Sequence, residues 1–244
     1  MRRLADAREL LDGPLDDPET LRGNLRDLGW MNRRMGGTAA SRRVLDQLLL
    51  GRTVPHTLLD VGTGGADIPL DLLAHAGRRG RTLRVTGIDS RSEVLEAARA
   101  VDPRLGRAEG LELVLTDGDL LPWPDRSFDV VHASLLLHHL EPSAAIAFLR
   151  EAARVARIGV VVNDLVRARH HLLGVRVVVA LTSRNRYTRN DAPLSVRRAY
   201  TRMELRALLA SAALRPVAEA SAPFGYRVAI AAVPMRELEE RRRQ

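Results

Sequence analysis

Leu58-Leu59-Asp60-Val61-Gly62-Thr63-Gly64-Gly65-Ala66-Asp67 is the most informative stretch of this chain. An apolar run ends at Asp60 and breaks into a glycine-rich turn, and residues 68–74 then read as a helix, which predicts strand, turn and helix. Glycines let the backbone turn sharply and let a ligand approach the main chain closely. Asp67 stands where a dinucleotide fingerprint has its third glycine, and its carboxylate would repel a pyrophosphate. The turn therefore suits a ligand that carries positive charge.

Outward from this turn, apolar strand-like segments alternate with helix-like ones. The predicted strands are residues 57–59, 83–88, 111–115, 128–134, 158–162, 214–219 and 226–233, and the predicted helices are residues 41–50, 68–74, 92–100, 144–156 and 203–210. This alternation predicts an α/β fold, a Rossmann-like, doubly wound and mostly parallel seven-stranded sheet with helices on both faces. Ligands of such folds bind beyond the carboxyl ends of the strands, where Asp60, Asp89, Asp117 and Ser134 fall.

The chain divides into three parts by its composition. Residues 1–50 are charged and only loosely apolar, which predicts an N-terminal helical extension, residues 51–234 form the main domain, and residues 235–244 are a charged tail. Within the main domain, the arginine-rich insert 165–196 follows the fifth predicted strand and is expected to act as a lid. Its apolar patch, residues 172–181, suits either a lid or the face of a homodimer, the commonest soluble assembly.

Composition excludes several classes of protein. The 244 residues include no apolar run near the roughly 20 residues of a membrane span and no apolar signal core, so we expect a cytoplasmic protein with no membrane partner. The absence of cysteine excludes disulfides and thiolate chemistry. The net charge is +8 and all 38 basic residues are arginine, but only 3% of residues are aromatic, so a base-stacking platform is missing and nucleic acid is an improbable partner.

Acidic residues at the strand ends are placed for a nucleoside. Asp89 ends the second strand, where a carboxylate can accept both hydroxyl protons of a ribose. Asp117 could accept a hydrogen bond from the amino group of an adenine while the Gly118 amide faces a ring nitrogen. Asp117 is equally suited to forming a turn, and Asp119 competes for the same role.

A series of motifs in this order resembles a known family. The run from Asp60 through Asp89, Asp117, Leu121-Pro122-Trp123 and Ser127-Phe128-Asp129 to Leu137-His138-His139-Leu140 resembles the cofactor-binding core of class I methyltransferases, which use S-adenosylmethionine (SAM). Met31-Asn32-x-x-Met35 before Gly36-Gly37, and Ser195-Val196-Arg197-Arg198 before Glu204-Leu205, are similar to patterns in the ubiquinone and menaquinone C-methyltransferases. Ala66 departs from the family, which usually has a third glycine there, and the tryptophan-arginine pair of the quinone enzymes is missing.

The resemblance implies the cofactor and its contacts. The cofactor is SAM, and the residues expected to bind it are Asp60, Gly62, Thr63, Gly64, Asp67, Asp89, Ser90, Asp117, Gly118 and Ser134. The implied reaction moves a methyl group to oxygen or carbon of a small hydroxylated aromatic, quinol-like or polyketide-like acceptor. Two alternatives remain, an RNA-directed methyltransferase that uses the arginines and a non-catalytic protein that keeps the fold.

The histidines are candidates for acid–base work. His138 and His139 follow the fourth strand, and an imidazole there could remove a proton from the acceptor, or the pair could cap the strand and pack near the cofactor. His132 lies within the strand and is expected in the core. His170 and His171 in the insert could contact the acceptor. The histidines are not spaced with carboxylates as metal ligands on a helix, so no metal site is expected.

The acceptor pocket is expected to take residues from the C-terminal motif and the end of the fifth strand. Tyr187, Arg197 and Tyr200 are predicted to shape it together with the N-terminal helix. Asn163 and Asp164 end the fifth strand and could either position an acceptor or cap a helix.

Overall fold

The computed structural model describes residues 1–5, 7–15, 17–52, 56–116 and 120–235. Its strands are β1 (His56–Val61), β2 (Leu83–Asp89), β3 (Leu111–Leu115), β4 (Phe128–Ser134), β5 (Ala156–Leu165), β6 (Leu214–Ser221) and β7 (Arg227–Pro234). Its helices are α1 (Pro18–Arg34), α2 (Gly37–Leu48), α3 (Asp67–Arg78), α4 (Ser92–Val101), α5 (Pro142–Val155), α6 (Arg169–Thr182), α7 (Arg186–Arg198) and α8 (Arg202–Ser211). Short 3₁₀ turns include η1 (Leu10–Asp12) and η3 (Leu137–His139).

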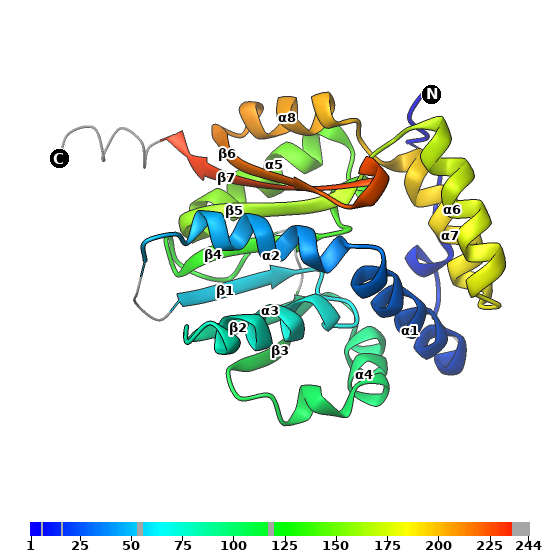
Figure 1. The fold of residues 1–244 in the computed structure, drawn as a ribbon, viewed down its shortest axis with the longest axis horizontal. Helices are drawn as coiled ribbons and strands as arrows, with labels where there is room; N and C mark the ends of the chain where they lie inside the picture. The colour runs from blue at the N-terminus through cyan, green and yellow to red at the C-terminus, as the bar shows by residue number, and fades with distance from the viewer. Residues whose placement is uncertain (6, 16, 53–55, 117–119, 236–244) are drawn as a thin grey trace.

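The strands form one seven-stranded sheet in the order β3-β2-β1-β4-β5-β7-β6 (Figure 1). Strands β1 to β5 pair in parallel, and β7 lies antiparallel between β5 and β6. The predicted mostly parallel, doubly wound sheet is confirmed. The strand order reverses between β1 and β4, and a ligand crevice is expected at the carboxyl ends of these strands.

Alternate residues of the central strands face the two helical layers. On β1, Leu59 and Val61 pack in the cluster that holds α5 and α8, while Leu58 packs in the cluster that holds α2 and α3. On β5, Val160 and Val162 pack in the cluster with α5 and α8, and Val161 packs in the cluster with α2 and α3. This two-residue period on strands that are apolar throughout explains why both faces of the sheet are covered.

The N-terminal part is more integrated than a loose extension. Helix α2 belongs to the main core beneath β5, β6 and β7, and it begins at Gly37 rather than at the predicted Ser41, because Gly36 adopts φ +89° and turns the chain there. Helix α1 continues through Trp30 and packs with α4 and α7 around a third apolar cluster. The predicted frayed helix of the tail lies, apart from Met235, outside the described residues, and no helix among the described residues is long and apolar enough to cross a membrane.

A buried arginine ties the N-terminal helices to the sheet. Arg227 on β7 is 2% exposed, and its guanidinium donates to the side-chain oxygens of Asn163, Asn32 and Ser134 at 2.7, 2.6 and 2.5 Å. Asn163 donates in turn to Ser41 of α2 at 2.6 Å. Burial lowers the pKa of Arg227, and among the described residues no carboxylate lies within salt-bridge distance of it. Neutral amide and hydroxyl oxygens therefore hold this cation in place.

We predict that Arg227→Met lowers the free energy of unfolding by about 3 kcal/mol, because the buried oxygens of Asn32 and Asn163 would lose their donor. Arg206→Met is the matched control, since Arg206 is exposed on α8 and its pair with Glu219 contributes less than about 1 kcal/mol. Urea unfolding of both variants measures the difference. Equal midpoints for the two would contradict the role given to Arg227.

Candidate functional site

One large cavity opens at the carboxyl ends of β1, β2 and β4. Its volume is about 1250 Å³, and its wall includes parts of α1, α6 and α7 as well as the glycine turn. Ten of the predicted site residues line it, namely Asp60, Gly62, Thr63, Gly64, Asp67, Asp89, Ser90, Ser134, His138 and His139. Asp117 and Gly118 lie outside the described residues. The fold therefore brings the predicted cofactor residues and the histidine pair to the same space.

The glycine turn and Asp89 form one end of the cavity. Gly62 and Gly64 have φ values of +68° and +54°, which glycine adopts without strain, and Ala66 adopts +52° where the chain enters α3. The Gly64 amide donates to one Asp89 oxygen at 3.0 Å, and the Arg91 amide donates to the other at 3.1 Å. Burial raises the pKa of Asp89 despite these two donors. The carboxylate is thus fixed in direction and still gains from further donors on a ligand.

Two other predicted cofactor residues differ in what they offer. The hydroxyl oxygen of Thr63 is buried and has no hydrogen-bond partner among the described residues, and it lies against Gly87 of β2, where an added Cβ would come within 2.8 Å of it. Asp60 is already engaged, because its Oδ1 lies 2.5 Å from Nδ1 of His132, whose Nε2 lies 2.8 Å from the Ser41 hydroxyl. The predicted core position of His132 is confirmed.

Asp67 and Asn32 link the turn to α1. The Asn32 amide donates to both oxygens of Asp67, at 3.2 and 3.1 Å. Burial raises the pKa of Asp67. A carboxylate in this setting favours a cationic ligand group beside it, as the sequence predicts.

The histidine pair forms a second part of the cavity wall. Nδ1 of His138 lies 2.7 Å from Oδ1 of Asp164, and the His138 amide donates to Oδ2 at 3.1 Å. Although burial raises the pKa of Asp164, the charge and hydrogen bond of His138 outweigh it and leave that pKa below its usual value. The contact between Nδ1 and Asp164 fixes the ring of His138, so its Nε2 edge faces Glu9 and the cavity. This is the geometry of an oriented general base.

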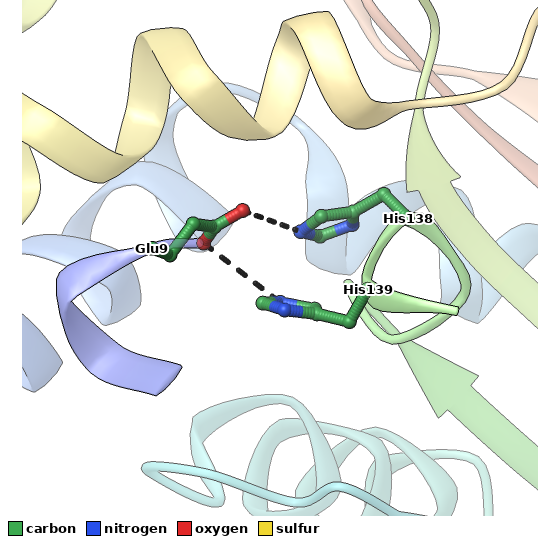
Figure 2. Close-up of side chains that lie close together, drawn as sticks. All are labelled: Glu9, His138 and His139. Atoms are coloured by element: carbon green, nitrogen blue, oxygen red, sulfur yellow. Dashed lines mark ion pairs between the residues drawn. The ribbon is translucent and has the colours of Figure 1, made fainter. Parts of the chain in front are cut away.

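The segment around Glu9 closes this part of the wall. Figure 2 shows the Glu9 carboxylate facing the edges of both rings, with one oxygen 3.8 Å from Nε2 of His138 and the other 3.8 Å from Nε2 of His139. Nδ1 of His139 lies 3.1 Å from Asp12, which also accepts a 2.7 Å hydrogen bond from Arg198. Burial, opposed by His139 and Arg198, raises the pKa of Glu9 to about 7. Glu9 therefore titrates near neutrality in the folded protein.

Glu9, His138 and His139 could also hold a divalent cation. One ligand atom from each lies within 4.8 Å of the other two. Carboxylates on the far ring nitrogens would orient both imidazoles toward such an ion. The expectation of no metal site rested on spacing along the sequence and did not include Glu9, which is more than 120 residues away; it stays a prediction.

Three predicted acceptor residues lie away from the cavity wall. Tyr187 is buried in the apolar cluster between α1, α4 and α7. The Tyr200 hydroxyl donates to the Leu140 carbonyl at 2.7 Å, and its ring stacks under Arg3. Arg197 lines a separate surface depression with Arg176 and Arg189. All three help to pack the helices around the site, and none of them lines the cavity.

Other side chains on the cavity wall were not predicted from the sequence, or were given there only as possible contacts. Glu9, Asn32 and Arg227 line it, and so do His170 and His171, which the sequence placed in the insert as possible contacts. Asp164 accepts hydrogen bonds from His138 and does not line the cavity, so the two alternatives given for it, positioning an acceptor or capping a helix, stay open. Buried Glu9 has no local sequence signal, because it depends on the N-terminal segment reaching η3.

Parts of the chain are similar to a family model and to curated proteins. Residues 59–162 match the family model described as "Methyltransferase domain". A ubiquinone/menaquinone biosynthesis C-methyltransferase of Rickettsia akari is 35% identical over 32% of this chain and 33% of its own length. A 27-O-demethylrifamycin SV methyltransferase of Amycolatopsis mediterranei is 31% identical over 56% of this chain and 48% of its own. The chain thus spans about a third to a half of the length of these curated relatives.

Solved structures confirm the fold. The crystal structure of a SAM-dependent methyltransferase from Aquifex aeolicus aligns with 88% of this chain and 97% of its own, at 21% identity and a TM-score of 0.61. Residues 59–162 thus match a methyltransferase domain model, and the strand order and the solved structures show that the chain has the class I SAM-dependent methyltransferase fold. The cofactor of this class is SAM.

We predict that Glu9→Gln raises the thermal midpoint at pH 8 and has little effect at pH 5. The folded pKa of Glu9, about 7, exceeds the ordinary glutamate pKa of about 4.5, so the folded state holds the proton more tightly. Wild-type stability therefore falls as pH rises from about 4.5 to about 7, by roughly 1.4 kcal/mol for each unit of pKa difference, and glutamine avoids this loss. Exposed Glu19→Gln should show a difference from wild type that is flat between pH 5 and pH 8, and a similarly flat difference for Glu9→Gln would refute the assignment.

Proposed function

We propose that this protein is a SAM-dependent methyltransferase that acts on a small hydroxylated aromatic, quinol-like or polyketide-like acceptor, at oxygen or at the carbon next to it. The observation that carries the proposal is that one cavity is lined both by the glycine turn with Asp89 and by His138, which Asp164 orients. Its volume of about 1250 Å³ accommodates a cofactor and an acceptor together.

The cofactor end fits SAM in two respects. Asp89 is held by two amides and has lone pairs left for ribose hydroxyls. Asp60 and Asp67 place negative charge beside the turn, which favours the ammonium and sulfonium groups of SAM over a pyrophosphate.

At the acceptor end, the protein's own groups handle the proton. Bound SAM supplies an electrophilic methyl group. His138 Nε2 takes the proton of the acceptor hydroxyl, and Asp164 stabilises the imidazolium that forms. Loss of that proton raises electron density on the oxygen and on the adjacent ring or enol carbon, so either atom can accept the methyl group. Apolar side chains of the wall, such as Leu136 and Val178, keep water out.

We predict that Asp89→Ala weakens SAM binding about 10- to 100-fold, because hydrogen bonds to a charged group are lost. Calorimetric titration with SAM and with S-adenosylhomocysteine measures the effect, and NADH serves as the ligand control. Glu96→Ala on the exposed face of α4 is the matched variant and should bind as wild type does. A folded wild-type protein that binds no SAM would overturn the proposal.

We predict that His138→Asn lowers kcat by about 100-fold or more while SAM affinity stays close to wild type, since the residue serves proton transfer. Single-turnover assays with [methyl-³H]SAM and a panel of phenols and enolised polyketides provide the measurement. His139→Asn should have a smaller effect, because His139 and its partner Asp12 are partly exposed, whereas His138 and Asp164 are buried. A chelator should leave kcat unchanged. If the chelator abolishes activity and a divalent metal restores it, the site works through a metal ion and His138 is not the general base.

A further inference from the structure

The outer face of α6 is an apolar stripe without a covering element. Leu173, Val177 and Leu181 follow one another at four-residue intervals and are 66%, 51% and 81% exposed. The opposite face carries His171 and Val179, which are buried. A helix that served only to cover the cavity would present polar residues to water, so this stripe indicates contact with another apolar phase.

The stripe adjoins the mouth of the cavity. Val177 and Phe224 both line the cavity, although Phe224 is 96% exposed. Phe224 has φ +60°, a left-handed conformation that is strained for an aromatic residue, and its carbonyl oxygen lies 3.1 Å from Nε2 of His171 on α6. The backbone thus holds an aromatic side chain outward at the rim, next to α6.

Positive charge surrounds the stripe. Residues 165–190 contain six arginines and no aspartate or glutamate. Arg167 is buried and pairs with Glu204, but the other five are exposed, namely Arg169, Arg176, Arg184, Arg186 and Arg189. In the described part of the chain none of these five lies within ion-pair distance of a carboxylate. They are available to an anionic surface.

We propose that the apolar stripe of α6, flanked by these arginines, docks on an anionic lipid bilayer and that a lipophilic acceptor enters the cavity from the bilayer past Val177 and Phe224. Basic residues around an apolar helix face are the arrangement that binds the surface of anionic membranes. The acceptor part of this inference rests on the proposed methyltransferase function. A bilayer partner was not expected from the sequence because no segment spans a membrane, but surface docking needs no such segment.

Other partners fit this surface less well. A two-fold dimer through α6 would place the same arginines against their own copies, where like charges repel. Nucleic acid would use the arginines but leave the aliphatic stripe in water, and the stripe offers no aromatic ring for stacking.

The first test is co-sedimentation of the full-length protein with vesicles. Wild type should bind vesicles of phosphatidylcholine and phosphatidylglycerol, bind phosphatidylcholine alone poorly, and be released by high salt. The double variant Leu173→Asp/Leu181→Asp changes two stripe residues that do not line the cavity and should lose binding. Leu50→Asp/Met203→Asp, at two equally exposed apolar residues elsewhere, should bind as wild type does.

The second test separates docking from chemistry. In the stripe variant, SAM binding and methylation of a water-soluble acceptor should persist, while methylation of an alkylated acceptor carried in vesicles should fall about tenfold or more. If wild type does not bind SAM, the proposed methyltransferase function is wrong, and vesicle binding still tests the docking proposal by itself. If wild type does not bind anionic vesicles, the docking proposal is wrong. It is also wrong if the stripe variant keeps vesicle binding and only changes a dimer to a monomer or loses RNA binding.

Discussion

The cation of Arg227, buried among neutral oxygens, is the interaction on which the site depends. Its guanidinium connects β7 to β5 through Asn163, to α1 through Asn32 and to the end of β4 through Ser134. Asn32 then reaches Asp67 at the start of α3. The N-terminal helices, the sheet and the glycine turn are thus fixed by one set of short hydrogen bonds, each strengthened by the low dielectric of the interior.

The site is closed by contacts between segments far apart in the sequence. Glu9 and Asp12 from the N-terminal segment meet His138 and His139, and Arg198 of α7 holds the two acids. The N-terminal segment and the helical insert therefore enclose the same end of the cavity. In the proposed function, the sheet and its loops bind the cofactor, and these two additions to the sheet select the acceptor.

Much of the fold and of the cofactor end could be predicted from local sequence. Apolar strands that end in Asp60 and Asp89 follow directly from period and turn chemistry, and both residues line the cavity. The acceptor end could not be predicted in this way. Tyr187 was expected in the pocket but is buried between helices, while Glu9 was missed, because only tertiary packing decides where the insert and the N-terminal segment settle.

A crystal structure with S-adenosylhomocysteine bound would test the central claim most directly. We predict that Asp89 accepts hydrogen bonds from the ribose hydroxyls and that the sulfur atom faces His138 across open space large enough for an acceptor. A product analogue bound elsewhere, or one whose sulfur points away from His138, would contradict the assignment of the two ends of the cavity.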